Sequence, residues 1–372
     1  MNYKETLFFI AKCLTISLEE KNRDEIEIIL KTMNVDWEAV VKVSTSHYVF
    51  PALYCNFKRA DFVKYLPADL VEYMIHITNL NRDRNAQILQ QAQELNSLLL
   101  ANNIRPIFLK GAGNLLAGIY DDIGERMVGD IDFIFSKEDY PKAITVLREF
   151  GYSEVKNKKY YAPDEKKHYR RLQKETNIAA VEIHSGLLNL IEYIYANEFN
   201  YNFVEKDSQV IKGVTVLGYA NKLNLSIIAN QINDSGFYYK TMALRNAYDV
   251  FLLSKKINTK DAVNSLNKLS HPLNCFLAAC DEVFNNVETI EYNKNAKTAL
   301  YLRNFNNQFT NPIRGKFKRS KIYLFIKRIF YILSKLIIYK EYRVFLFNSL
   351  TDKNWYKDKL IQFGIKKSKI TK

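Results

Sequence analysis

The sequence predicts an α+β fold, in which a small central sheet lies between N-terminal and C-terminal helical regions. Apolar residues recur at helical spacing over 1–103. Short apolar runs typical of strands then alternate with helical patterns over 104–220, which is the pattern of an α+β core. Helical periodicity returns over 221–313, and a basic, aromatic-rich helical tail follows over 314–372.

Two features define the predicted N-terminal helical region. Leu7, Ile10 and Leu14 recur at helical spacing, and Pro51, which is tolerated in the first turn of a helix, predicts a helix start after a tight junction. A long helix is then predicted over 78–102, because its apolar residues form one continuous stripe.

The central region alternates strands and helices. We predict strands over 104–109, 129–135 and 178–183, where apolar residues form short runs. The segment 114–120 is predicted to be a helix under the first strand, and 139–150 an amphipathic helix that ends at a glycine.

Beyond the central region, helices are predicted over 223–233 and 240–253. Arg245 and Asp249 stand four residues apart on the second of these helices, so we expect an intrahelical ion pair. The alternative is that this helix contacts a nucleotide.

The bulk composition, 48% hydrophobic and 25% charged, is that of an ordinary globular protein. The cysteines lack the spacing of a zinc site, so we expect reduced thiols in a cytoplasmic protein. Met1–Glu5 includes an acid and precedes only a brief apolar stretch, which argues against a signal peptide. The four cysteines are Cys13, Cys55, Cys275 and Cys280.

The net charge of +14 is concentrated at the C-terminal end. Residues 314–372 carry 17 basic and 3 acidic side chains, whereas the rest of the chain holds 37 of each. This asymmetry indicates an interaction with an anionic membrane surface or with RNA, which would make the protein membrane-peripheral or nucleic-acid binding. The alternative is a helical arm that packs its apolar side on the body. Within residues 321–347, the longest uncharged run, Ile329–Ser334, is too short to span a bilayer.

An acid pair in an apolar run is the main functional signal. Asp130 and Asp132 lie two residues apart in the predicted strand 129–135, so their side chains share one face. Two neighbouring carboxylates repel each other and favour a divalent cation between them. The alternative is a strand end with solvated acids.

A third acid follows on the next predicted strand. Glu182 lies between Val181 and Ile183, and we expect it to complete the metal site with the acid pair. His184 shares its strand face and is a candidate to position a phosphate or to act as a general base, with a structural histidine as the equal alternative.

A glycine turn with a lysine precedes the acid pair. Lys110, Gly111 and Ala112 offer an ammonium group and backbone N–H groups, which suit a phosphate. Arg126 is a further candidate for the triphosphate, with a surface arginine as the alternative. The turn lacks the Gly-Lys-Ser/Thr pattern of a P-loop.

The order of these motifs resembles that of the uncharacterised bacterial nucleotidyltransferases of the polymerase-β-like superfamily. The similarity covers roughly residues 1–255. Its segments are Phe108–Ala112, Arg126–Asp132 and Val181–His184, with Val49–Tyr54 and Leu244–Asp249 as supporting similarities.

The resemblance implies a mixed sheet with flanking helices and two catalytic Mg²⁺ ions, with Mn²⁺ as the alternative metal. It implies that Asp130 and Asp132 bind the metals, that Glu182 is the third acid, and that Lys110 with Gly111 forms the phosphate turn. Two departures are visible: Ala112 stands where the superfamily usually has serine, and Glu182 replaces the more usual aspartate.

These observations predict an Mg²⁺-dependent nucleotidyltransferase that moves an NMP group from an NTP, such as ATP, to an unidentified hydroxyl acceptor and releases pyrophosphate. The two departures and the basic tail support an alternative, a catalytically inactive nucleotide-binding or membrane-peripheral adaptor. The sequence gives no indication of oligomeric state.

Overall fold

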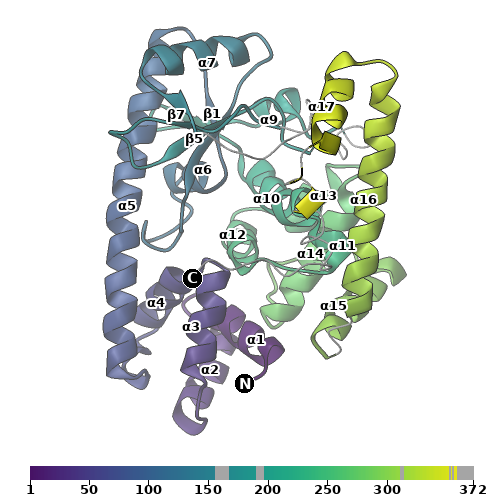
Figure 1. Ribbon diagram of the computed structural model, residues 1–372. Helices are drawn as coiled ribbons and strands as arrows, with labels where there is room; N and C mark the ends of the chain where they lie inside the picture. The colour runs from purple at the N-terminus through teal and green to yellow at the C-terminus, as the bar shows by residue number, and fades with distance from the viewer. Residues whose placement is uncertain (156–166, 190–196, 311–313, 352, 354–355, 358–372) are drawn as a thin grey trace.

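The structure of the protein is a computed structural model. It describes residues 1–155, 167–189, 197–310, 314–351, 353 and 356–357, of which 310, 314–321 and 341 are described by their backbone alone. The last part of the predicted tail, 358–372, lies outside the described residues. Figure 1 shows a sheet with a helix on each side, an N-terminal helical group at the far end of one long helix, and further helices beside the sheet.

The N-terminal region is helical, as predicted. Asn2 caps the first helix in a reciprocal capping box with Glu5, and Pro51 occupies the first turn of the fourth helix. The helices are α1 (Tyr3–Cys13), α2 (Glu20–Thr32), α3 (Trp37–Ser46) and α4 (Phe50–Arg59).

A single long helix, α5 (Ala68–Ala101), connects this group to the sheet (Figure 1). It begins ten residues before the predicted 78–102, because Pro67 occupies its N-cap position and Leu70 and Met74 extend its buried stripe. With 34 residues it is about 50 Å long.

In the described residues, seven strands form one mixed sheet in the order β3-β4-β5-β2-β1-β7-β6, which confirms the predicted fold class. In the centre, β2 runs parallel to β5 and antiparallel to β1, while β1 runs parallel to β7. The strands are β1 (Ile107–Leu109), β2 (Asp130–Ile134), β3 (Ser153–Glu154), β4 (Leu172–Gln173), β5 (Ala180–His184), β6 (Gln209–Ile211) and β7 (Val214–Val216).

The predicted strands are present, and the four outer strands are additions. β3, β4, β6 and β7 have only two or three residues each, which is too short for a periodic pattern. α6 (Lys110–Leu116) begins directly after β1, four residues before the predicted 114–120. It lies on one side of the sheet, whereas α7 (Asp139–Glu149) lies on the other (Figure 1).

Helices return after the sheet. The predicted helix 223–233 is a continuous pair, α10 (Tyr219–Ile228) and the π-helical turn η2 (Ala229–Asn233). The predicted 240–253 begins later because Lys240 has a φ of 57° and ends α11. The elements after α10 and η2 are α11 (Gly236–Tyr239), α12 (Leu244–Ser254), α13 (Thr259–Asn264), α14 (Ser270–Val283) and α15 (Ala296–Thr310), and α9 (Tyr201–Glu205) precedes β6.

One hydrophobic core runs through all of these elements, from Leu7 to Phe305. The N-terminal helices, the sheet and the later helices therefore share a continuous apolar interior, and the predicted domain boundaries stay predictions. All four cysteines are free and buried in this core.

The last described elements form a helical hairpin, α16 (Arg314–Leu336) and α17 (Lys340–Thr351). Its small apolar cluster, centred on Ile332, Tyr342 and Phe345, is separate from the main core. In Figure 1 the hairpin lies along the edge of the molecule, next to α11. Within the described chain, no helix is both long enough and apolar enough to cross a bilayer.

Candidate active site

The register between β2 and β5 brings the predicted functional side chains together. These parallel strands place Asp132 opposite Glu182 and Ile134 opposite His184. Because alternate residues of a strand point to the same face, Asp130, Asp132, Glu182 and His184 all project from one face of the sheet.

Three of these side chains form a compact group. One ligand atom each of Asp132, Glu182 and His184 lies within 4.8 Å of the other two. Nε2 of His184 is 2.8 Å from Oδ1 of Asp132 and 3.9 Å from Oε2 of Glu182. Nδ1 of the same ring lies 3.2 Å from the carbonyl oxygen of Gly186. With its proton on Nε2 the ring donates to Asp132, whereas a proton on Nδ1 would donate to Gly186 and free the Nε2 lone pair for a metal ion.

The ammonium group of Lys110 lies among these three ligands. It pairs with Oδ1 of Asp132 and lies 3.4 Å from Nε2 of His184 and 3.8 Å from Oε2 of Glu182. Lys110 reaches them from the first position of α6, with a φ of 49° that L-residues rarely adopt. A strained backbone of this kind is typical of functional sites.

The pKa shifts show that negative charge is only partly balanced here. Burial would raise the pKa of Asp132, but Lys110 and His184 hold it well below its usual range. Burial and the neighbouring charge of Asp132 raise the pKa of Glu182 to about 7. Burial and Lys110 lower the pKa of His184 to about 4, so its ring is neutral at pH 7. The site thus contains a carboxylate that would ionise more readily if a further cation were bound.

Asp130 lies on the same face, but its carboxylate pairs with Arg171 rather than with the compact group. Nε of Arg171 is also 3.8 Å from Oε1 of Glu182. Nε2 of His168 lies 3.8 Å from Oε2 of Glu182, and its ring centroid is 5.2 Å from that of His184.

Sequence reasoning missed the segment that carries Arg171 and His168, along with Lys167. This segment lies beside β5 through a bridge between His168 and His184, and two backbone N–H groups after β5 donate to the carbonyl of Lys167. A run of basic residues shortly before Glu182 is the signal that could have found it.

A second set of charged groups lies within electrostatic reach of the compact group. Burial raises the pKa of Asp234, and the charges of Lys167, Arg245 and Lys110 lower it. Burial and the neighbouring Lys110 lower the pKa of Lys167 to about 8. Burial also lowers the pKa of Arg245. Asp234 directly follows η2, and π-helical turns are frequent at functional sites.

The expected ion pair between Arg245 and Asp249 is wrong. Asp249 is buried and instead accepts hydrogen bonds from Arg126, at 3.0 and 3.1 Å, and from the hydroxyl of Tyr120. The guanidinium carbon Cζ of Arg245 lies 5.0 Å from the ring centroid of Tyr48. The buried Nε of Arg245 has no hydrogen-bond partner in the described chain. The buried Arg126 is therefore the cation that neutralises Asp249.

Arg126, predicted to contact a triphosphate, is itself buried. Besides Asp249, it donates to the backbone carbonyl of Met127 at 2.9 Å. The loop that carries it is held by α5, because Asn81 and Asn85 donate to the carbonyl groups of Gly124, Ile123 and Arg126. A direct contact of Arg126 with substrate stays a prediction.

The glycine turn is buried under the sheet. Gly111 and Ala112 form the first turn of α6, directly after Lys110. A Cβ atom at Gly113 would lie 2.6 Å from the carbonyl oxygen of Phe108, so glycine alone permits this approach of α6 to β1. This close contact fixes where Lys110 leaves the strand.

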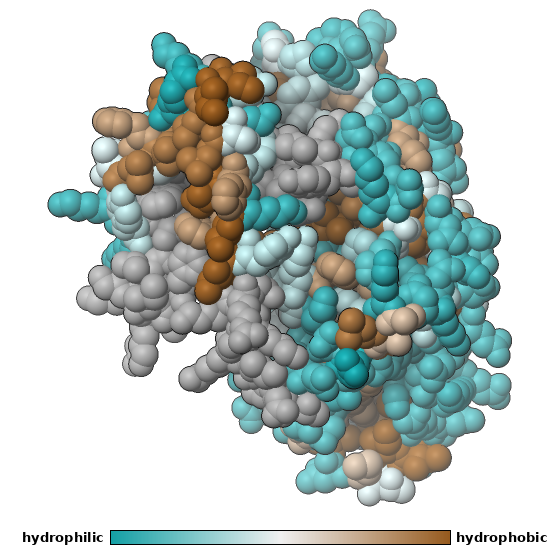
Figure 2. Space-filling view, turned by 90° about the vertical axis from the view of Figure 1, so that its right-hand side faces the viewer, coloured by the Kyte–Doolittle hydropathy of each residue, from teal (hydrophilic) through white to brown (hydrophobic). Residues whose placement is uncertain are grey.

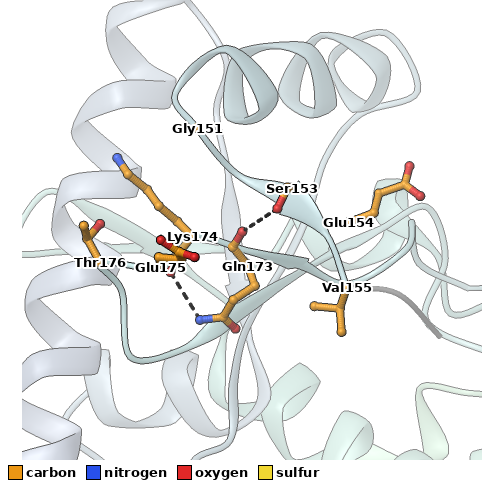
Figure 3. A pocket seen from close by; sticks show the side chains of 8 residues that line it. All are labelled: Gly151, Ser153, Glu154, Val155, Gln173, Lys174, Glu175 and Thr176. Atoms are coloured by element: carbon orange, nitrogen blue, oxygen red, sulfur yellow. Dashed lines mark hydrogen bonds between the residues drawn. The ribbon is translucent and has the colours of Figure 1, made fainter.

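A separate pocket lies at the edge of the sheet that is formed by β3 and β4. Figure 3 shows it between Ser153 and Val155 on one side and the segment from Gln173 to Thr176 on the other. Its lining includes none of the compact group and no side chain that pairs with it.

Comparisons with known proteins identify the family of this chain. The chain resembles a solved structure, the crystal structure of an antigenic nucleotidyltransferase-like protein from Paracoccidioides brasiliensis, at 13% identity and a TM-score of 0.34, over 56% of this chain and 91% of that chain. No curated protein sequence matches this chain. A family model described as uncharacterised nucleotidyltransferase matches residues 33–283, which is more than half of the chain and includes β1, β2 and β5. The protein therefore belongs to the uncharacterised nucleotidyltransferase family.

Proposed function

We propose that this protein is an Mg²⁺-dependent nucleotidyltransferase that transfers an NMP group from an NTP to a hydroxyl acceptor. In this reaction the acceptor oxygen forms a bond to the α-phosphorus, the bond from that phosphorus to the pyrophosphate oxygen breaks, and the acceptor loses its proton. The observation that carries the proposal is the convergence of Asp132, Glu182 and His184 around the ammonium group of Lys110.

The donor set fits a divalent metal. Asp132 and Glu182 supply the carboxylate oxygens that Mg²⁺ and Mn²⁺ prefer, and the neutral His184 adds a nitrogen that suits Mn²⁺ better. Asp130 would serve a second ion, on the exposed side where it now pairs with Arg171. When bound, the metal would polarise the α-phosphate and neutralise the charge that develops there.

Cations from three elements would hold the triphosphate. Lys110 is the nearest to the carboxylates, and its ammonium group would bind an oxygen of the triphosphate. Lys167 lies within electrostatic reach of Asp132 and Glu182, and Arg245 lies within reach of Asp234. Within the described part of the chain, neither Lys167 nor Arg245 forms an ion pair. Arginine and lysine at such positions bind phosphate oxygens through charge-assisted hydrogen bonds. In this proposal the turn amides of Gly111 and Ala112 contribute further donors.

The test is NTP binding by calorimetry on the full chain, with and without Mg²⁺. We expect binding that requires the metal and that weakens by at least about tenfold in Asp132→Asn and Glu182→Gln, because each variant removes one charged ligand. Glu154→Gln is the matched control: it changes the same functional group on the same sheet, at a glutamate that pairs with Arg148 and Arg170 outside the site.

Metal-independent binding, or equal binding by all three variants, would contradict the proposed site. Metal-dependent binding without pyrophosphate release in the presence of cell extract would instead favour the inactive nucleotide-binding alternative.

A further inference from the structure

Exposed apolar side chains are concentrated on the α16–α17 hairpin. Of the 26 large hydrophobic residues that are exposed in the described chain, 11 lie between residues 322 and 350. Figure 2, which looks at the side of the molecule that carries the hairpin in Figure 1, shows apolar side chains gathered in a continuous band. Contiguous apolar surfaces of this kind mark interaction sites.

These side chains follow the helical repeat. On α16 they recur at intervals of three or four residues, which places them on one face. That stripe consists of Ile326, Phe330, Leu333 and, at the end of the helix, Ile337. On α17 the exposed apolar residues are Val344, Phe347 and Leu350, again at helical spacing.

The turn between the two helices is the most exposed apolar point. Ile337 is 84% exposed, the largest value among the exposed hydrophobic residues of the described chain, and Ile338 is 70% exposed. Both precede α17 directly, and Tyr339 completes the turn. The turn is therefore an apolar tip and not a polar connection.

The hairpin is held together independently of this surface. Tyr342 and Phe345 of α17 pack against Ile332 of α16 on the inner side. A guanidinium N–H of Arg343 donates to the carbonyl of Leu336 at 2.9 Å, which satisfies the end of α16. At its base the hairpin contacts the body through Tyr323, whose ring centroid is 5.6 Å from that of Tyr238. The exposed stripe is thus not needed to fold the hairpin.

Basic residues flank the tip. Lys335 precedes it, and Lys340 and Arg343 follow it. The segment 314–372 carries the whole net charge of +14, so the apolar surface lies in a strongly positive part of the chain. A surface that combines apolar insertion with positive charge is complementary to a lipid surface that has acidic headgroups. RNA would match the charge but would leave the aliphatic tip exposed, because bases stack on aromatic and guanidinium groups.

We propose that the α16–α17 hairpin docks this protein onto anionic lipid membranes, with Ile337 and Ile338 inserted between the headgroups and the flanking cations paired with lipid phosphates. The stripe on α16 then lies along the interface.

The experiment is co-sedimentation of the full chain with vesicles. We compare phosphatidylcholine alone with phosphatidylcholine that contains phosphatidylglycerol, at low and high salt, for the native protein and for Ile337→Ser/Ile338→Ser. We expect binding to the anionic vesicles only, weakened by salt, and at least about tenfold weaker in the double variant, because two isoleucines that would insert into the membrane are lost. The matched control is Ile28→Ser/Met33→Ser, which changes two similarly exposed residues near the end of α2 and should bind as the native protein does.

Equal binding to neutral and anionic vesicles, no binding to either, or full binding by the tip variant would overturn the proposal. Binding to a single-stranded RNA homopolymer without vesicle binding would also overturn it and assign the tail to nucleic acid. A dimer in solution that the tip variant converts to a monomer, without vesicle binding, would assign the tip to a second copy of the chain.

Discussion

Two clusters of charged side chains lie within the same fold, and they are built in opposite ways. Around Asp249, the buried carboxylate receives two hydrogen bonds from Arg126, one from Tyr120 and one of 3.4 Å from Asn114, so donors and acceptors match. In the other cluster, carboxylate oxygens of Asp132 and Glu182 lie within 4.8 Å of each other. Burial and the charge of Asp132 raise the pKa of Glu182 to about 7.

This difference separates a structural cluster from a functional one. Burial of a charge requires a partner, and the Asp249 cluster provides that partner within the chain. In the Asp132 cluster, the positive groups of the chain balance only part of the negative charge. This arrangement is favourable only if a ligand supplies the remaining positive charge. Functional sites often lower the stability of the ligand-free protein in this way, because the groups that bind the ligand are not fully paired without it.

The largest expected effect comes from breaking the matched cluster. Asp249→Asn should lower the free energy of unfolding by about 3–5 kcal/mol, because it leaves the buried Arg126 without a counter-charge. Chemical denaturation measures this change, with Asp24→Asn, an exposed acid on α2, as the control that should stay within about 0.5 kcal/mol of the native protein. A loss of less than about 1 kcal/mol for Asp249→Asn would show that the network is not structural.

The opposite sign is expected for Glu182→Gln. The pKa of Glu182 is higher in the folded chain than its ordinary value of 4.5, so its ionisation removes stability as the pH rises from about 4.5 through about 7. In metal-free protein at pH 8 the variant should therefore gain roughly 1–3 kcal/mol in the free energy of unfolding. Near pH 4, where the glutamate is protonated, the variant and the native protein should be equally stable.

Glu154→Gln gives the matched comparison for this pH profile. Tyr169 and Arg170 lower the pKa of Glu154, so that group contributes stability above its ordinary pKa and loses it as the pH falls. Its replacement should reduce stability at pH 8, opposite to Glu182→Gln. Denaturation curves at the two pH values test both signs, and a destabilised Glu182→Gln at pH 8 would contradict the unbalanced-charge interpretation.

The smallest effect on stability, with a clear effect on binding, is expected at Arg245. Arg245→Gln should weaken NTP binding by about tenfold, the size of one lost charge-assisted hydrogen bond, and should change the free energy of unfolding by less than about 1 kcal/mol. The diphosphate should lose less affinity than the triphosphate if Arg245 contacts the terminal phosphate. Arg170→Gln, which removes an exposed arginine paired with Glu154, is the control. Unchanged NTP binding in Arg245→Gln would place this arginine outside the site.

Much of the central architecture was predictable, because β2 and β5 are five-residue runs with strong apolar patterns. The alternation within each run also predicted that Asp130 and Asp132 share a face. The pairing of β2 with β5 was not encoded locally, although it is what places Glu182 opposite Asp132. The sequence does not distinguish a functional His184 from a structural one, because only the assembled sheet shows which groups its Nε2 faces.

The partners of charged side chains were the least predictable part. Arg245 and Asp249 have ideal helical spacing, but Asp249 faces a buried loop whose Arg126 lies 123 positions earlier in the chain. Lys167, His168 and Arg171 lie next to strands too short to predict, so their approach to Glu182 depends on tertiary pairing. Spacing along the sequence shows which charged side chains can pair. Which of these pairs forms depends on how the side chains are buried in the folded chain.

The three candidate metal ligands meet only when β2 and β5 pair in the correct register. A shift of one residue between these strands would move Glu182 and His184 to the face opposite Asp132, because side chains alternate along a strand. Such a shift would keep Glu182 and His184 together but would separate both from Asp132, so metal affinity would report whether the two strands have paired in the correct register. A ligand that binds only the correct register also stabilises it, and divalent metal would therefore suppress mispaired chains during refolding.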